Sequence, residues 1–250
     1  MTDVLLNHRS IRKYKNDPVD VDLLHKILNA GVRASTTGNM QLYSIIVTRE
    51  QEMKDALAPL HFNQAPIKEA PVVMTFCADF NRFSTWCKLR NAEPGYDNFL
   101  SFFTAAIDAL LVAQNICIAA ESEGLGICYF GTTTYMAEQI IELLKLPKGV
   151  VPVTTVTIGY PDETPVQTDR LPLPAVVHRE VYKNYTEETI NTFYAEKEAD
   201  PANKQFIEEN GKETLAQVFT DIRYTKNDNV TFSESLLAVL EKQGFMNNFK

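Results

Sequence analysis

Residues 102–120 read FFTAAIDALLVAQNICIAA, a long run in which apolar side chains fall on nearly every face of a helix. Polar residues interrupt the run at Thr104, Asp108, Gln114 and Asn115. We therefore predict a core helix rather than a membrane span. Such a helix must be covered all round, either by its own domain or by a second subunit. Gly124 and Gly126 follow the run and are predicted to end the helix.

Four segments around this helix are rich in β-branched residues and are predicted to be strands. They are residues 43–48, 71–78, 126–130 and 151–158. Mixing about four strands with helices fits either an α/β or an α+β fold, and the pattern alone leaves both open.

Further helices are predicted on both sides of the strands. The first begins at Asp20 or Asp22, both good N-cap residues, and ends near residues 31–35. A polar helix covers about 50–57, and another covers about 135–144, with residues 132–134 as cap candidates.

After residue 158 the character of the chain changes. Residues 159–165 are rich in turn formers, and from residue 186 the sequence is polar and helical with a break at 200–203. We predict a single domain over residues 1–250. Its core covers about 1–180, and a helical extension, about 181–250, packs on the main body.

The composition, 45% hydrophobic and 22% charged, is that of a folded globular protein. A net charge of −8 makes nucleic acid an unfavourable partner. The four cysteines are far apart and form no CxxC pair, and the four histidines are scattered, so we predict neither structural disulfides nor a metal site. The opening residues lack the pattern of an export signal, and we expect a cytoplasmic protein.

Three polar clusters are candidates for chemistry. The first, residues 7–13, contains His8, Arg9, Ser10 and Arg12, which together could bind a phosphate. Taken alone, this cluster also fits an exposed charged turn.

The second cluster, residues 34–41, follows the first helix. Its hydroxyl and amide side chains, Thr36, Thr37, Asn39 and Gln41, could border a polar heterocycle. An ordinary helix-ending loop has the same composition.

The third cluster, residues 129–134, lies at a strand-to-helix turn. Backbone N–H groups at such a turn are available to a ligand, and Gly131 allows close approach, although a simple helix cap explains the same residues. The chain contains no GxGxxG, P-loop or GxSxG signature, so dinucleotide-fold, P-loop and serine-hydrolase sites are not supported.

The order and spacing of these clusters resemble the FMN-dependent nitroreductase family, in particular its oxygen-insensitive NADPH nitroreductase and flavin reductase P branch. The matching segments are residues 8–12, 39–41, 76–82, 113–126, 144–147, 159–161, 170–172 and 177–178. Each match is weak alone, but the ordered combination is specific.

The resemblance implies roles for particular residues. The phosphate of FMN would be bound by His8, Arg9, Ser10 and Arg12, with Arg170 as a second cationic ligand. Contacts to the ring and ribityl chain would come from Thr36, Thr37, Asn39, Gln41 and Gln64. The turn over the flavin would be Tyr129, Phe130, Gly131 and Thr132, and no side chain would be an essential acid or nucleophile.

The resemblance also implies the fold, reaction and assembly. The fold would be α+β, with a mostly antiparallel sheet flanked by helices and C-terminal segments wrapping the partner subunit. The enzyme would be a homodimer with two flavin sites at its interface, and residues 102–120 would form the central interface helix. NADPH or NADH would reduce FMN, and nitroaromatics, quinones or flavin would be reduced in a two-electron ping-pong mechanism.

Two departures from the family pattern bear on affinity and specificity. Thr168 stands where the family has a lysine, which removes one cation from the phosphate site. Residues 203–212 contain two lysines and two glutamates, where this branch has an arginine-rich loop for the extra phosphate of NADPH. We therefore expect a relaxed or NADH-leaning preference.

Three other functions remain open at this stage. One is a flavin or ene-type reductase on the same FMN scaffold, with an acceptor pocket shaped around Phe83, Trp86 and Tyr96. A second is an FMN-binding module without turnover. The third is a plain interaction protein, which predicts a colourless sample.

Overall fold

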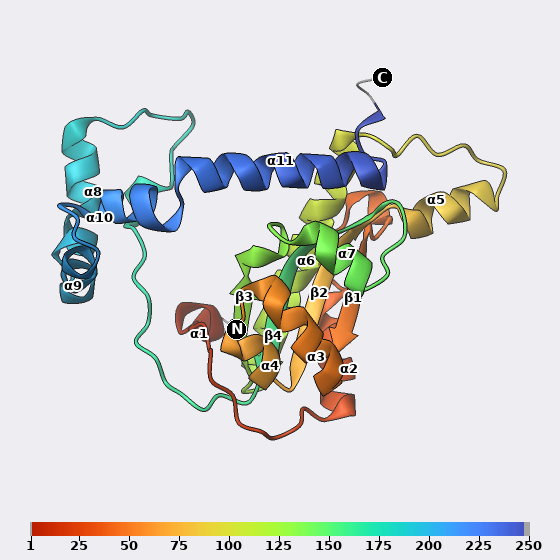
Figure 1. The fold of residues 1–250 in the computed structure, drawn as a ribbon, viewed down its shortest axis with the longest axis horizontal. Helices are drawn as coiled ribbons and strands as arrows, with labels where there is room; N and C mark the ends of the chain where they lie inside the picture. Colours follow the sequence, from red (N-terminus) through yellow and green to blue (C-terminus); the bar gives the residue numbers. More distant parts are fainter. Residues whose placement is uncertain (1, 248–250) are drawn as a thin grey trace. The chain divides into compact units, whose positions relative to one another are not determined.

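The computed structural model describes residues 2–247 of the chain. These form two compact units, one comprising the chain up to residue 166 together with the segment from residue 232 onward, and the other comprising residues 167–231 (Figure 1). The predicted sheet and the apolar helix both belong to the first unit.

The sheet of the first unit has four strands in the order β1-β2-β4-β3. Their bounds are Tyr43–Thr48 for β1, Val72–Asp79 for β2, Gly126–Phe130 for β3 and Val150–Gly159 for β4. All neighbouring strands run antiparallel, with Ile45 opposite Phe76 and Cys128 opposite Thr157. The predicted strands are confirmed to within one residue at each end, and the fold is α+β.

Helices of the first unit cover both faces of this sheet (Figure 1). Their bounds are Thr2–Leu6 for α1, Val21–Gly31 for α2, Gln51–Leu57 for α3, Ala65–Glu69 for α4, Asn81–Lys88 for α5, Phe99–Ser122 for α6 and Ala137–Leu143 for α7. Shorter 3₁₀ turns lie at Thr37–Asn39, Ala58–His61 and Gly131–Thr133.

The main core lies between α2, α6 and one face of the sheet. Alternate residues of β2, such as Met74 and Phe76, are fully buried there. Helix α2 begins at its predicted cap, because the Asp20 carboxylate accepts the backbone N–H groups of residues 22 and 23. At the far end of α2, a Cβ on Gly31 would lie 2.1 Å from the side chain of Ile116, so glycine lets α2 and α6 approach closely.

The opposite face of the sheet packs against α3, α4 and α7. Val73 of β2 and Phe130 of β3 point to this side and meet Leu57 and Ile67. Both faces of β2 are therefore buried, which explains why its sequence is a continuous apolar run.

The C-terminal helix, α11 (Lys226–Gln243), returns to the first unit from residue 232 onward. Val239, Leu240 and Phe245 are buried in a cluster with Leu42 and Phe102. The segment from residue 232 onward thus packs on the main body, whereas residues 167–231 form the second unit.

The second unit is helical. Its elements are a 3₁₀ turn at Leu173–Ala175, α8 (Glu187–Ala199), α9 (Pro201–Glu209), α10 (Leu215–Val218) and a π-helical turn at Phe219–Arg223. The predicted break falls at Asp200, which ends α8 and accepts the N–H of Ala202 to begin α9.

Two local predictions differ from the structure. The hydroxyl of Thr133 donates to the carbonyl of Phe130 instead of capping a helix, and residues 131–133 form a 3₁₀ turn. Helix α7 therefore begins only at Ala137, with no side-chain cap. Helix α6 begins earlier than predicted, because the Asn98 side chain accepts the N–H of Ser101 and caps it.

Helix α6 has one buried face and one uncovered face. Large apolar side chains at helical spacing are 42–70% exposed on the uncovered face: Leu100, Phe103, Ile107, Leu110 and Leu111. By length and composition α6 is the one helix among residues 2–247 that could cross a membrane. Its other face carries the core of the sheet, as predicted for a core helix.

Candidate functional site

The first predicted cluster lies beside strand β3. Ser10 forms an isolated parallel bridge with Ile127, whose carbonyl accepts the N–H of Ile11 at 2.8 Å. One residue earlier in the cluster, Arg9 donates to the carbonyl of Asn7 at 3.1 Å. This pairing places the phosphate-binding candidates next to the first half of β3, two residues before the third cluster begins.

Two anchors hold the ends of this first cluster. His8 Nδ1 lies 2.6 Å from the carboxylate of Glu121, at the end of α6. The backbone N–H groups of Arg12 and Lys13 both donate to Glu163, at 2.5 and 3.1 Å. Because the backbone provides the second anchor, the side chain of Arg12 is left exposed to bind a ligand.

A cavity of about 560 Å³ joins the first cluster to two other predicted groups. Arg12, Gln64 and Phe130 all line it. Its remaining lining residues are Lys13, Tyr14, Ala65, Pro66, Glu69, Cys128 and Asp162. The cavity thus combines two cations, two acids, an amide and apolar surface, and its cations and apolar surface suit a ligand with a phosphate and a flat ring.

The turn after β3 borders this cavity. Tyr129 is partly exposed and its hydroxyl lies 3.4 Å from the side chain of Gln114, while burial raises its pKa. A Cβ built on Gly131 would meet nothing within 4 Å, so there is open space over the backbone at this position. This is the space that a ligand in contact with the main chain requires.

His61 supports the same turn and was not predicted from the sequence. The ring is fully buried, its Nδ1 is hydrogen bonded to Thr132 Oγ1 at 2.8 Å, and it packs edge-on against Phe130. Burial lowers the pKa of His61 to about 4, so the imidazole is neutral near pH 7.

The second predicted cluster is built around a buried acid of α6. Asp108 is fully buried, and its carboxylate accepts the hydroxyl of Thr36 at 2.5 Å and the N–H of Thr37 at 3.0 Å. The same carboxylate accepts the hydroxyl of Thr37 and the N–H of Leu42, both at 3.2 Å. The two threonine hydroxyls therefore hold the loop in place.

The tip of this loop is exposed and has an unusual backbone. Gly38, Asn39 and Gln41 have φ of 54°, 56° and 54°, in the left-handed region. Arg82 donates to the carbonyl of Gln41, and the side chains of Gln41 and Asn39 lie 3.4 Å apart. Such conformations cluster at ligand sites, so Asn39 and Gln41 remain the ligand candidates of this loop.

The structure brings Arg12 of the first cluster and Phe130 of the third together with Gln64 at the cavity, whereas the other predicted residues of these clusters and the whole second cluster are not among its lining residues. No residue of the loop at 36–41 lines the 560 Å³ cavity. The loop is anchored to α6 at Asp108 and the first cluster at Glu121, thirteen residues or about 20 Å of helix apart.

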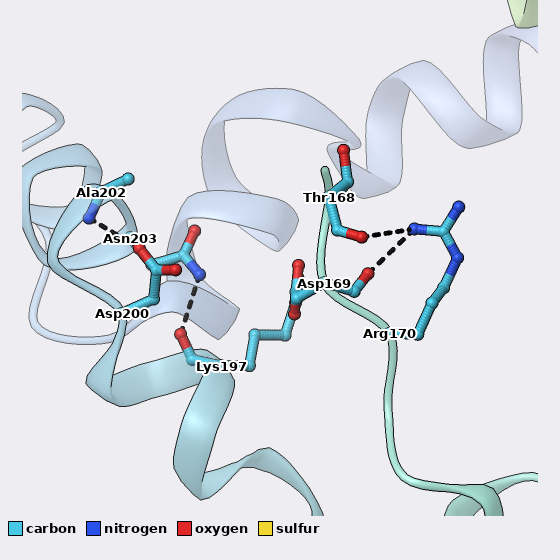
Figure 2. A network of polar contacts seen from close by, with 7 residues as sticks. All are labelled: Thr168, Asp169, Arg170, Lys197, Asp200, Ala202 and Asn203. Atoms are coloured by element: carbon cyan, nitrogen blue, oxygen red, sulfur yellow. Dashed lines mark hydrogen bonds and ion pairs between the residues drawn. The ribbon is translucent and has the colours of Figure 1, made fainter. Parts of the chain in front are cut away.

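Arg170 lies in the second unit, where a polar network surrounds it (Figure 2). Its Nη1 donates to the carbonyls of Thr168 and Asp169, at 3.2 and 2.9 Å. The carboxylate of Asp169 accepts from Lys197 at 2.9 and 3.1 Å. Lys197 therefore offsets the acid next to Arg170, in the segment that contains Thr168.

Cys77, Cys117 and Cys128 are not activated as nucleophiles. All four are buried and free, and burial raises the pKa of Cys77 and of Cys117 to about 12 and also raises that of Cys128. Within residues 2–247 there is no group of three His, Cys, Asp or Glu side chains that could hold a metal ion.

Comparison with known proteins identifies the family. The family model described as "Nitroreductase family" matches residues 5–160. The FMN reductase [NAD(P)H] of Bacillus subtilis is 35% identical over 96% of this chain and 96% of its own. The chain belongs to the nitroreductase family.

Two further nitroreductase relatives match over nearly the whole chain. The oxygen-insensitive NADPH nitroreductase of Salmonella typhimurium is 32% identical over 97% of both chains. The crystal structure of a Bacteroides fragilis protein, described as an oxidoreductase, is 59% identical over 98% of this chain and 99% of its own, with a TM-score of 0.97. The predicted family, fold and enzyme class are thereby confirmed, and the cofactors in the relatives' names, FMN and NAD(P)H, are those predicted here.

The residues at the nitroreductase cavity fit FMN. Arg9 belongs to the first cluster but is not a lining residue; its Nε is buried and has no hydrogen-bond partner within residues 2–247, as expected of a donor meant for an anion. Arg12 and Lys13 add positive charge, and Gln64 can both donate and accept hydrogen bonds toward a heterocycle.

Sequence analysis missed three residues that shape this site. Asp108 was noticed only as an interruption of the apolar run, although a single acid in such a run requires donors nearby. His61 was noted only as one of four scattered histidines and Arg82 only as the end of the matching segment 76–82, because each acts through a tertiary contact, to Thr132 and to Gln41 respectively.

Proposed function

We propose that the protein is an FMN-dependent NAD(P)H oxidoreductase that reduces nitroaromatics, quinones or similar acceptors by a two-electron ping-pong mechanism. The observation that carries this proposal is the cavity in which Arg12, Gln64 and Phe130 meet beside the open turn at Gly131. Family membership supports the reaction class. A cytoplasmic location fits the four free cysteines.

Each part of the site has a separate task in this proposal. His8, Arg9, Ser10 and Arg12 bind the phosphate through charge-assisted hydrogen bonds. Gln64 contacts the ring, and the backbone of the turn from Tyr129 to Thr132 faces it. Asn39 and Gln41 complete the polar border, presented by the threonines that Asp108 holds.

The protein's contribution to the chemistry is binding and orientation. The chemistry that FMN supplies when bound is the transfer of a hydride from NAD(P)H to the flavin, and then of two electrons from the flavin to the acceptor. The cavity-lining residues carry no activated nucleophile, since the thiol of Cys128 has a raised pKa. Neutral His61 keeps the turn at Thr132 in place without adding charge.

Spectroscopy and steady-state kinetics test this proposal directly. We expect a yellow protein that releases about one FMN per chain on denaturation, and parallel lines in double-reciprocal plots with NADH and a quinone. A protein that holds flavin but reduces no acceptor would instead be an FMN-binding module without turnover. A colourless protein that cannot be reconstituted with FMN would overturn the proposal.

The exposed face of α6 supports a homodimer that shares its flavin sites. Leu100, Phe103, Ile107 and Leu110 follow the 3–4 spacing of a helix face that packs against another element. In a two-fold dimer on this face, the Thr36–Gln41 loop of each copy would complete the cavity of the other. This arrangement accounts for the separation of the two clusters within one chain.

The variant Leu110→Glu is expected to separate the dimer. It places a charge in the middle of the apolar face, where desolvation without a partner is unfavourable. Sedimentation velocity should show a monomer with reduced FMN content. The control Leu89→Glu changes a side chain that is 70% exposed outside α6 and should leave the dimer intact. A stable dimer of Leu110→Glu would contradict the interface.

The second unit supports a relaxed preference between NADH and NADPH. Residues 201–224 contain three cations and four acids. Lys212 forms an ion pair with Asp221 at 2.9 Å, and the guanidinium of Arg223 lies 4.3 Å from the centre of the Phe206 ring. Two of the three cations are thus engaged within the unit, which leaves little positive charge for the extra phosphate of NADPH.

We expect kcat/KM for NADPH to exceed that for NADH by less than about tenfold, since each charge-assisted phosphate contact is worth roughly that factor. The variant Asp221→Asn releases Lys212 and should shift the ratio toward NADPH. Initial rates with both nucleotides give the ratio. A strong NADPH preference of the unmodified protein would refute the expectation.

A further inference from the structure

A strained and exposed aromatic residue lies in the loop between His61 and Gln64. Phe62 and Asn63 have φ of 55° and 53°, so two consecutive residues other than glycine adopt the left-handed region. This conformation is uncommon for a bulky side chain and costs free energy. Even so, the ring of Phe62 is 53% exposed, and burial of the ring does not repay that cost.

Several contacts of the first unit keep this conformation in place. The N–H of Phe62 donates to Pro59 at 3.2 Å, and that of Asn63 donates to Ala58 at 2.8 Å. The Phe62 ring stacks on Tyr135 with centroids 6.5 Å apart at 27°, and Tyr135 stacks on Phe232 at 4.2 Å and 11°. One face of the ring is therefore backed by two further aromatic residues.

Phe62 is flanked in the sequence by two residues of the proposed flavin site. His61, the preceding residue, is hydrogen bonded to Thr132 of the turn that faces the flavin. Gln64, two residues later, lines the cavity with Arg12 and Phe130. The backbone that carries Phe62 is therefore fixed between the turn at Thr132 and the lining of the cavity.

We propose that Phe62, backed by Tyr135, is a stacking platform that binds planar aromatic acceptors and determines the specificity of acceptor reduction. This inference rests on the proposed function. Electron-poor rings, such as quinones and nitroaromatics, match the negative face of a phenyl ring. A nicotinamide nucleotide can be recognised through its sugars and phosphates, whereas a simple acceptor has mainly its ring to contact. We therefore assign the platform to the acceptor rather than to the nicotinamide nucleotide.

The test compares a planar acceptor, 1,4-naphthoquinone, with ferricyanide, which has no ring to stack. Phe62→Gly removes the ring and relaxes the left-handed backbone, so impaired folding is not an expected cause of its effect. Phe62→Tyr keeps the platform. We expect Phe62→Gly to raise KM for naphthoquinone by roughly 2- to 12-fold, the range for one aromatic pair, with kcat little changed.

Two further readouts accompany the kinetics. The Kd of naphthoquinone for the oxidised protein, measured from the change in flavin absorbance, should rise by the same factor as KM. In Phe62→Gly, the FMN content and kcat/KM with ferricyanide should equal those of the unmodified protein. Phe62→Tyr should match the unmodified protein in every measurement.

Three results would overturn the inference. An equal loss with both acceptors would show that Phe62 has a structural role, and a change in oligomeric state without a change in naphthoquinone Kd would place Phe62 at an interface between copies. A rise in KM confined to Trp86→Leu, a 55% exposed ring that contacts Phe83, would place the acceptor elsewhere. If the unmodified protein holds no FMN and reduces neither acceptor, the proposed function and this inference fail together.

Discussion

Arg12→Ala is expected to weaken the binding of FMN by about ten- to one-hundredfold, because one side chain then ceases to make charge-assisted hydrogen bonds to the phosphate. The fold should survive, since Arg12 is anchored through its backbone N–H to Glu163 and its side chain is exposed. Fluorescence titration of the apoprotein with FMN measures the change.

Riboflavin provides the decisive comparison for Arg12, because it has the ring but no phosphate. Its affinity should be the same in Arg12→Ala and in the unmodified protein, whereas Gln64→Ala should weaken both ligands. Arg90→Ala removes an exposed arginine that bonds only to the carbonyl of its neighbour Leu89, and controls for total charge. Equal FMN affinity in Arg12→Ala would remove the first cluster from the phosphate site.

Local elements of this fold could be predicted because their signals are local. The strand at 126–130 is β-branched and aromatic, and the helix at 21–31 begins at Asp20, whose carboxylate caps it. The strand order could not be predicted from these patterns. β2 pairs with β4, more than 70 residues later, and that choice depends on how α6 packs across the sheet.

The candidate site was predictable only in part for the same reason. The basic and hydroxyl clusters were visible as strings of residue types, but their supports lie far away in the chain. Glu163 binds the backbone at Arg12 and Asp108 binds Thr36, each across a long sequence separation. The threonines at 132–134 were wrongly predicted to be helix caps: the Thr133 hydroxyl instead donates to the carbonyl of Phe130 and lies 3.0 Å from the hydroxyl of Thr155 in β4.

Asp108→Ala is expected to have the largest effect on stability of any change at the site. The carboxylate is fully buried and accepts four donors from the loop at 36–42. Alanine leaves two backbone N–H groups and two hydroxyls without this partner, so we expect a loss of about 3–5 kcal/mol in the free energy of unfolding. Guanidinium titration measures this loss, with the exposed Asp17→Ala as control.

Asp108→Asn separates the loss of stability from the loss of function. The amide keeps one acceptor oxygen but turns an NH₂ group toward the remaining donors, so we expect a smaller loss of about 1–3 kcal/mol in a protein that still folds. If Asp108 presents Asn39 and Gln41 to the ring, this variant should bind both FMN and riboflavin more weakly, unlike Arg12→Ala. Unchanged binding of both ligands would show that the carboxylate stabilises the chain without shaping the site.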